Sequence, residues 1–149
     1  MIVGAGTVIT KEQAKAATDA GAKFIVSPGS DLEVIRYAKE LGVYMLPGAV
    51  TPTEVMQLIK EDIKVIKFFP AENYGGLKTI KALSAPFPNI KFVPTGGVSL
   101  SNLTAYLEFD KIAAVGGSWL CTKDLITKGK WDEITKLSKE AMDIFKSVR

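Results

Sequence analysis

A single lysine, Lys67, lies inside residues 65–72, an apolar stretch that begins as a typical buried strand. Successive side chains of a strand point to opposite faces, so Lys67 shares its face with Val65 and Phe69 rather than with solvating charges. Burial disfavours the charged ammonium, and a neutral amine can attack a carbonyl carbon and form a Schiff base. The alternative is a lysine whose stem packs while its head reaches water. The residues of this stretch fit both interpretations.

The composition restricts the remaining chemistry. The chain has 149 residues, of which 47% are hydrophobic and 23% charged, and this predicts one globular domain over residues 1–149. It contains no histidine and one cysteine, Cys121, which argues against a histidine-dependent triad, an intrachain disulfide and a zinc or iron site. We therefore expect no metal and no other cofactor. Protons must then be moved by a carboxylate, lysine, tyrosine or water.

The charge and hydropathy patterns argue against two classes of partner. The net charge is +3 with both signs interspersed, so there is no basic stripe of the kind that nucleic-acid binding needs. No run approaches the ~18 apolar residues of a membrane span, and the first residues do not resemble a secretion signal. We expect a small-molecule ligand, no nucleic-acid or membrane partner, and a cytoplasmic location.

The chain repeats one pattern, in which a short apolar run ending in Gly, Pro, Ser or Thr precedes a helical segment. The runs, which we predict to be strands, cover residues 2–8, 23–29, 43–48, 65–72, 91–97 and 112–118. Apolar strands alternating with helices predict an α/β fold with a parallel sheet, a (β/α) barrel of TIM type. Six of the eight strand–helix units of a closed barrel are present, so we expect a partial or open barrel with bare sheet edges.

Helix boundaries are also predicted by local chemistry. Thr51-Pro52-Thr53-Glu54 combines a capping hydroxyl, a proline in the first turn and a glutamate that can reach back, and Thr10 begins a similar pattern. Gly21 and Gly42 stand where a left-handed residue would end a helix. A last helix at about 131–147 would place a core-facing stripe along one side. That stripe consists of Ile134, Leu137, Ala141 and Phe145.

Two glycine-containing loops follow the last two predicted strands. Thr95-Gly96-Gly97 and Gly116-Gly117-Ser118 would lie at the carboxyl ends of the strands, where ligands bind in such folds. Glycines let backbone N–H groups approach an anion, and a following helix start adds its positive end. Tight turns are the alternative for either pair, but two pairs on successive strand ends favour a phosphate site.

Five motifs together resemble one family, in order and in spacing, over essentially the whole chain. These motifs are Gly4-Ala5-Gly6-Thr7-Val8, Ser27-Pro28-Gly29, Lys67-Phe68-Phe69-Pro70-Ala71-Glu72, Pro94-Thr95-Gly96-Gly97 and Gly116-Gly117-Ser118-Trp119. The chain resembles the 2-keto-3-deoxy-6-phosphogluconate (KDPG) aldolases, a family that includes 4-hydroxy-2-oxoglutarate (KHG) aldolases. The resemblance implies a lyase of trimeric eight-stranded barrel type. Such an enzyme cleaves KDPG to pyruvate and glyceraldehyde 3-phosphate without a metal.

The resemblance also implies roles for individual residues. Lys67 would form the imine with the keto group, and Thr7 would hold the pyruvate carboxylate. Pro28 and Phe69 would shape the pocket walls, while Thr95 would lie near the aldehyde end. The phosphate would be bound by Gly96, Gly97, Gly116, Gly117 and Ser118.

The chain departs from the family at its beginning. It starts where the family's third strand starts, so the first two strand–helix units are missing. With them go a glutamate that acts as general acid/base and an arginine that grips the carboxylate. Glu72 is the nearest candidate for the glutamate by sequence, although a glutamate after a strand is more often a helix-start or surface residue.

Three functional hypotheses remain after the sequence alone. The first is a class I aldolase that acts on KDPG, and also on KHG. The second is a non-catalytic phosphate- or keto-acid-binding remnant or assembly element of the same fold. The third is a different phosphate-binding barrel enzyme that uses the glycine loops but not Lys67.

Overall fold

Parallel strands and the helices that connect them make up most of the computed structural model, which describes residues 1–149. All the strands are short and their pairings are parallel. They are β1 (Ala5–Gly6), β2 (Phe24–Val26), β3 (Tyr44–Leu46), β4 (Val65–Phe68) and β5 (Lys91–Pro94). Five of the six predicted strand positions are confirmed, although each strand is shorter than its apolar run.

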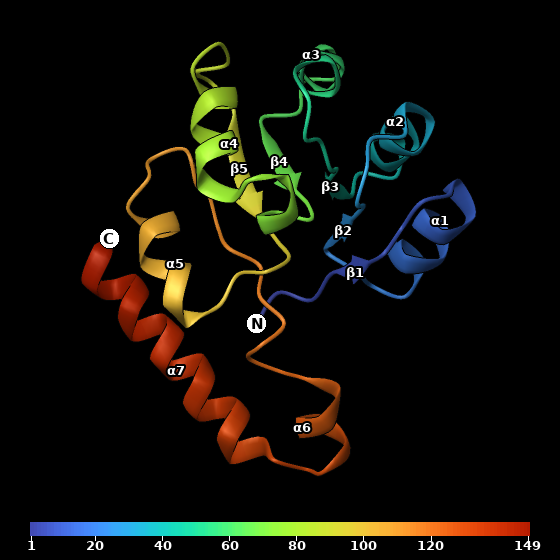
Figure 1. Ribbon diagram of the computed structural model, residues 1–149. Helices are drawn as coiled ribbons and strands as arrows, with labels where there is room; N and C mark the ends of the chain where they lie inside the picture. Colours follow the sequence, from blue (N-terminus) through green and yellow to red (C-terminus); the bar gives the residue numbers. More distant parts are fainter.

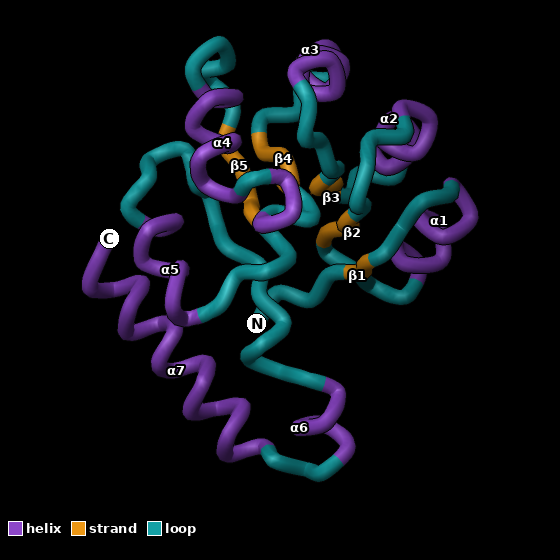
Figure 2. The backbone as a smooth tube through the Cα atoms, viewed as in Figure 1, coloured by secondary structure: helices purple, strands orange, loops and turns teal.

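The strands follow one another in chain order along an open arc (Figure 2). β1, β2 and β3 form one sheet, and β4 pairs with β5. An isolated parallel bridge between Gly48 and Lys67 joins the two groups: the Lys67 N–H donates to the Pro47 carbonyl at 2.8 Å, and the Ala49 N–H donates to the Lys67 carbonyl at 3.0 Å. The result is the partial barrel that the sequence predicted.

Helices cover the outer side of this arc and extend beyond it (Figure 1). No helix has the length and apolar character needed to cross a bilayer. The α-helices are α1 (Lys11–Asp19), α2 (Leu32–Glu40), α3 (Pro52–Lys60), α4 (Gly76–Ser84), α5 (Leu100–Leu107), α6 (Lys123–Thr127) and α7 (Trp131–Val148), with a 3-10 turn, η1 (Glu72–Tyr74), before α4.

The predicted helix boundaries are confirmed by the backbone. Thr51 and Glu54 form a reciprocal capping box at the start of α3, where the Thr51 N–H donates to the Glu54 carboxylate at 2.9 Å. Thr10 caps α1 by accepting a hydrogen bond from the next turn. Gly21 and Gly42 follow α1 and α2 with φ of +91° and +68°, the left-handed conformation that ends a helix without a Cβ penalty.

The core lies between the strands and the helices outside them. In β4 burial alternates, because Ile66 and Phe68 are fully buried whereas Val65 and Lys67 are only partly buried on the inner face of the arc. The Phe68 ring meets the Phe92 ring of β5 edge to face, with the ring centres 6.3 Å apart. This packing fixes which face of β4 carries Lys67.

The sixth predicted strand, residues 112–118, is not a strand. Its segment makes two isolated parallel bridges to β5, Phe92 to Ile112 and Thr95 to Gly116. Between the bridges Pro94 has no N–H to donate, and Gly116 rather than the preceding residue donates to the Pro94 carbonyl. The segment therefore contains one extra residue relative to β5, as in a bulge, and a regular ladder cannot continue.

The predicted stripe on the last helix is only partly covered. α7 packs along α5 (Figure 1), and Ile134, Leu137 and Ala141 are partly buried, but Phe145 remains 39% exposed. No residue of α7 is fully buried. The chain end is held by Arg149, whose guanidinium donates to the carbonyls of Leu107 at 2.8 Å and Phe109 at 2.9 Å.

Candidate active site

Lys67 lies on the inner face of the arc, with a strand neighbour on each side. Gly48 is its partner on the β3 side and Val93 is its partner in β5. Its Nζ lies 4.7 Å from the centre of the Phe69 ring, which favours the charged amine, whereas burial lowers the pKa of the amine from its usual value. No acidic group counters that lowering. The lowered pKa therefore agrees with the interpretation of Lys67 as a desolvated amine.

The residue beside Lys67 must be small. A Cβ on Gly48 would lie 2.0 Å from the Pro28 carbonyl oxygen, which no side chain can tolerate. The Gly48 N–H also donates to the Gly29 carbonyl at 3.0 Å. Pro28 is thus brought next to the Lys67 strand through Gly48. Gly48 was not among the predicted site residues, although its place after Pro47 repeats the Pro-Gly ending of the preceding run.

Phe69 and Thr95 connect the lysine to the glycine loops. A Cβ on Gly96 would lie 3.3 Å from both the Phe69 ring and the Pro70 Cα, so the loop backbone packs against that ring. Thr95 touches the second loop, because a Cβ on Gly116 would lie 2.9 Å from the Thr95 Oγ1. Lys67, Phe69, Thr95, Gly96 and Gly116 therefore form one continuous group at the carboxyl ends of the strands.

The glycine loops expose backbone donors. The N–H groups of Gly96, Gly97 and Val98 in the first loop, and those of Gly117 and Ser118 in the second, have no acceptor within the chain. Gly96 and Gly97 have φ of +94° and +79°, where a side chain would be strained. Successive free N–H groups of this kind suit an anion such as phosphate.

Thr7 is less closely joined to this group. It is exposed and follows β1, which lies on the far side of β2 and β3 from β4. It shares the carboxyl end of the arc with Lys67, but β2 and β3 lie between the strands that carry the two residues. Ser118 is likewise exposed at the other end of the arc.

The Glu72 carboxylate is bonded to Tyr106, whereas acid–base chemistry would require it beside the substrate at Lys67. Its carboxylate accepts a hydrogen bond of 2.5 Å from the hydroxyl of Tyr106, a buried residue of α5. Burial first, and this carboxylate second, raise the pKa of the Tyr106 phenol. Tyr106 was not among the predicted site residues, and because it lies far from Glu72 in sequence, nothing local could have paired them.

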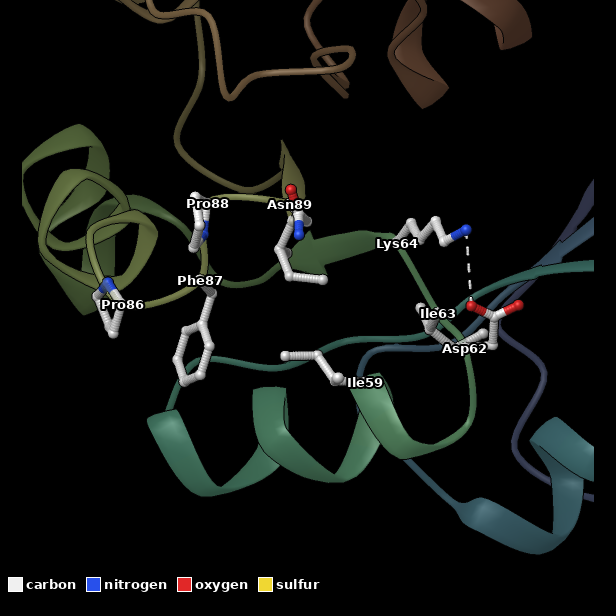
Figure 3. Close-up of a pocket in the computed structure, with 9 residues that line it drawn as sticks. Ile59, Asp62, Ile63, Lys64, Pro86, Phe87, Pro88 and Asn89 are labelled. Atoms are coloured by element: carbon white, nitrogen blue, oxygen red, sulfur yellow. Dashed lines mark ion pairs between the residues drawn. The ribbon is translucent and has the colours of Figure 1, made fainter.

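A separate hollow lies at the opposite end of the strands (Figure 3). It has a volume of about 310 Å³ and is lined by residues that precede β4 and β5, among them Lys64 and Ile90. In a parallel α/β sheet, ligands bind at the carboxyl ends of the strands, where Lys67 lies. No three His, Cys, Asp or Glu side chains lie close enough together to hold a metal ion.

Comparisons with known proteins agree with this geometry. The family model "Aldolase: KDPG and KHG aldolase" matches residues 1–137. The chain is 43% identical over 143 residues to the 2-dehydro-3-deoxy-phosphogluconate aldolase of Pseudomonas aeruginosa, covering 96% of this chain and 65% of that protein. It is 42% identical over 142 residues to the KHG/KDPG aldolase of Escherichia coli K12, covering 95% and 67%. The chain therefore spans about two thirds of the length of these curated relatives.

Solved structures are similar over about the same fraction of the chain. The KDPG aldolase of Legionella pneumophila, with pyruvate captured as a covalent carbinolamine, matches with a TM-score of 0.90 and 37% identity, over 96% of this chain and 68% of that one. The aldolase of Zymomonas mobilis ZM4 with 3-phosphoglycerate matches with a TM-score of 0.87 and 37% identity, over 94% and 66%. On sequence and on structure, the chain belongs to the KDPG and KHG aldolase family.

Proposed function

We propose that the chain is a class I aldolase, a carbon–carbon lyase that cleaves KDPG to pyruvate and glyceraldehyde 3-phosphate, with KHG as a second substrate. The observation that carries the proposal is the Lys67 amine, partly buried on the inner face of β4 with its pKa lowered by burial. The Legionella relative, in which pyruvate is captured as a covalent carbinolamine, supports the same chemistry.

The proposed reaction begins when the neutral Lys67 amine adds to the C2 carbonyl of the substrate. The resulting carbinolamine loses water to give an imine, which is protonated. The C4 hydroxyl then loses its proton, the C3–C4 bond breaks, and the bonding electrons move into an enamine. The aldehyde leaves, the enamine takes a proton at C3, and water hydrolyses the imine to release pyruvate and the free amine.

The residues around Lys67 supply binding in this proposal. Phe69 and Pro28 form walls beside the amine, and Thr95 lies between the lysine and the loops, at the aldehyde end. The phosphate is bound by the N–H groups of the two glycine loops, Gly96-Gly97 and Gly116-Gly117-Ser118. The Zymomonas mobilis relative, solved with 3-phosphoglycerate, supports a phosphorylated ligand. Thr7 would bind the carboxylate.

Proton transfer is the weak step of the proposed reaction. No carboxylate perturbs Lys67, and the Glu72 carboxylate is bonded to Tyr106. In this proposal water accepts the C4 hydroxyl proton. Because a positioned acid–base group contributes about 10²–10⁴-fold in rate, we expect turnover slower by about that factor than in a relative that has such a group.

Reductive trapping tests the proposal. Borohydride added with pyruvate should attach one reduced pyruvyl group to the chain, and peptide mass spectrometry should locate it on Lys67. Lys67→Ala should remove the adduct, while Lys64→Ala, which changes an exposed lysine, should leave it in place. An adduct that persists in Lys67→Ala would refute the role of the lysine.

A non-catalytic role is the second candidate, and the missing acid–base partner of Lys67 favours it. In that case KDPG would stabilise the chain against heat without aldol cleavage. A lactate dehydrogenase-coupled assay for pyruvate distinguishes the two, because any turnover that depends on Lys67 rejects the binding-only function.

The assembly and location also belong to the proposal. We propose a cytoplasmic homo-oligomer, the trimer that the family implies. Its support is the exposed apolar surface of the first residues, where Ile2 and Val3 are 75% and 61% exposed. Sedimentation equilibrium would give the mass in solution, and a monomer at micromolar concentration would contradict the trimer.

A further inference from the structure

The carbonyl groups of the first glycine loop are both held by the protein. The Gly96 carbonyl accepts a hydrogen bond from the Glu72 N–H at 3.2 Å, and the Gly97 carbonyl accepts one from the Asn102 side-chain amide at 3.2 Å. Carbonyl oxygens would repel an anion, so this arrangement directs them into the protein. The N–H groups of Gly96, Gly97 and Val98 are left without acceptors.

Glu72 supports the loop through its side chain as well. A Cβ on Gly97 would lie 2.5 Å from the Glu72 Cγ, so the stem of the glutamate lies directly against that glycine. The carboxylate continues past the loop to Tyr106, whose hydroxyl donates to it at 2.5 Å. Gly76 leaves the room for this bond, since a Cβ there would lie 2.9 Å from both oxygens.

Helix α5 supplies both of the side chains that reach this region. Asn102 and Tyr106 are four residues apart, so they lie on the same face of the helix. Asn102 also accepts a hydrogen bond from the Ser99 N–H at 2.9 Å, which fixes the side chain that holds the Gly97 carbonyl. The bond to Tyr106 anchors the Glu72 carboxylate to α5.

We propose that Asn102, Tyr106 and Glu72 are positioning residues that hold the Gly96–Gly97 turn in the conformation that binds the phosphate end of the substrate. The inference rests on the proposed function, because that function makes the loop a phosphate site. It adds that affinity for the phosphate, but not reactivity of Lys67, depends on these three side chains.

Three variants separate this role from general stability. Tyr106→Phe removes the hydroxyl that fixes the Glu72 carboxylate, and Asn102→Ala removes the donor to the Gly97 carbonyl. Each should weaken binding of a phosphorylated ligand about tenfold, the factor that one lost hydrogen bond to a charged or constrained group gives. Glu72→Gln keeps the stem and an oxygen that accepts from Tyr106, so phosphate affinity should be retained or improved.

The first measurement is the concentration of ligand that gives half-maximal borohydride trapping of Lys67. KDPG, which has the phosphate, is compared with pyruvate, which lacks it. In Tyr106→Phe and Asn102→Ala the KDPG value should rise about tenfold while the pyruvate value stays unchanged. Equal rises for both ligands would indicate a structural role only and overturn the inference. An unchanged KDPG value would overturn it too.

The second measurement does not depend on Lys67. Inorganic phosphate is titrated into ¹⁵N-labelled chain while the amide signals of Gly96, Gly97 and Val98 are followed. These signals should shift in the wild type and in Glu72→Gln, and require about tenfold more phosphate in Tyr106→Phe. Failure of pyruvate trapping with an intact phosphate response would reject only the proposed aldolase chemistry. Absence of the phosphate response in the wild type would reject the positioning inference itself.

Discussion

The chain up to Ile112 and the chain after it are built differently. Every fully buried side chain lies between Val8 and Ile112, and no residue after Ile112 is buried. α3 buries Val55 and Leu58 within nine residues, whereas α7 buries none in 18. The first region pairs strands side by side and packs helices over them. The second is joined to β5 by backbone hydrogen bonds from Ala113 and Gly116, and its long helix packs along α5.

This difference divides the candidate site. Lys67, Phe69 and the Gly96–Gly97 turn are fixed by the packed region, because β4 and β5 pair over their whole length. Gly117 and Ser118 lie beyond the last bridge to β5 and are held by the less buried region. We infer that the amine and the first loop are preorganised, and that the second loop is held by weaker contacts.

The largest difference is expected between two phenylalanines. Phe68→Ala should lower the free energy of unfolding by about 3–5 kcal/mol, because the ring is fully buried against Phe92. Phe145→Ala, in the 39% exposed side chain of α7, should cost less than about 1 kcal/mol. Urea unfolding followed by circular dichroism measures both. Similar costs would show that α7 is as well packed as β4.

A smaller effect is expected from adding one methyl group beside Lys67. Gly48→Ala places a Cβ against the Pro28 carbonyl and should cost about 1–3 kcal/mol, with reduced pyruvate trapping. Gly29→Ala is the matched control, since a Cβ there meets nothing within 4 Å. Its stability should change by no more than about 0.5 kcal/mol. Equal changes in stability for the two variants would contradict the close approach of Gly48 to the Pro28 carbonyl.

Two helix caps compare the regions more finely. Thr51→Ala should lower global stability by about 1 kcal/mol, because α3 is part of the core and its capping box would be lost. Thr122→Ala removes the cap of α6, which buries no residue, and should affect local order more than global stability. Hydrogen exchange should show faster exchange confined to α6 in the second variant. Exchange that rises across the strands instead would contradict the division.

The smallest effect is expected from pH. Burial lowers the pKa of Lys67 in the folded chain, so between that pKa and the ordinary value of 10.5 the unfolded chain binds more protons. The cost of burying the charged amine is therefore fully present below the lowered pKa and disappears as pH rises toward 10.5. Relative to Lys67→Met, the wild type should gain stability over that range. Parallel pH curves of unfolding free energy would contradict the lowered pKa.

Most of the fold could be predicted because its signals are local. Alternation of apolar runs and helices indicated the parallel α/β arrangement, and Thr51, Gly21 and Gly42 marked helix ends through bonds within a few residues. The strand predicted at residues 112–118 was wrong for a physical reason. Pro94 of the neighbouring β5 has no N–H to donate to this segment, and the apolar pattern of the segment itself does not show this. A strand needs a regular partner as well as its own pattern.

The candidate site shows the same limit. The sequence selected Lys67 and the face it occupies, since strand periodicity depends only on adjacent residues. It also selected the glycine loops by their place after apolar runs. Tyr106 could not be selected in the same way, because its bond to Glu72 joins residues 34 positions apart.

The sequence by itself thus determined the family, the order of most strands and helices, the helix caps and the choice of the lysine that we propose to be the reactive amine. Only the tertiary structure decided that Gly48 must lack a side chain because it lies against Pro28. It also decided that Glu72 and Asn102 donate to the glycine-loop carbonyls, and that no side chain after Ile112 is buried. The reason is physical. Backbone conformation depends on near neighbours in sequence, whereas close approach, burial and pKa depend on which distant segments pack together.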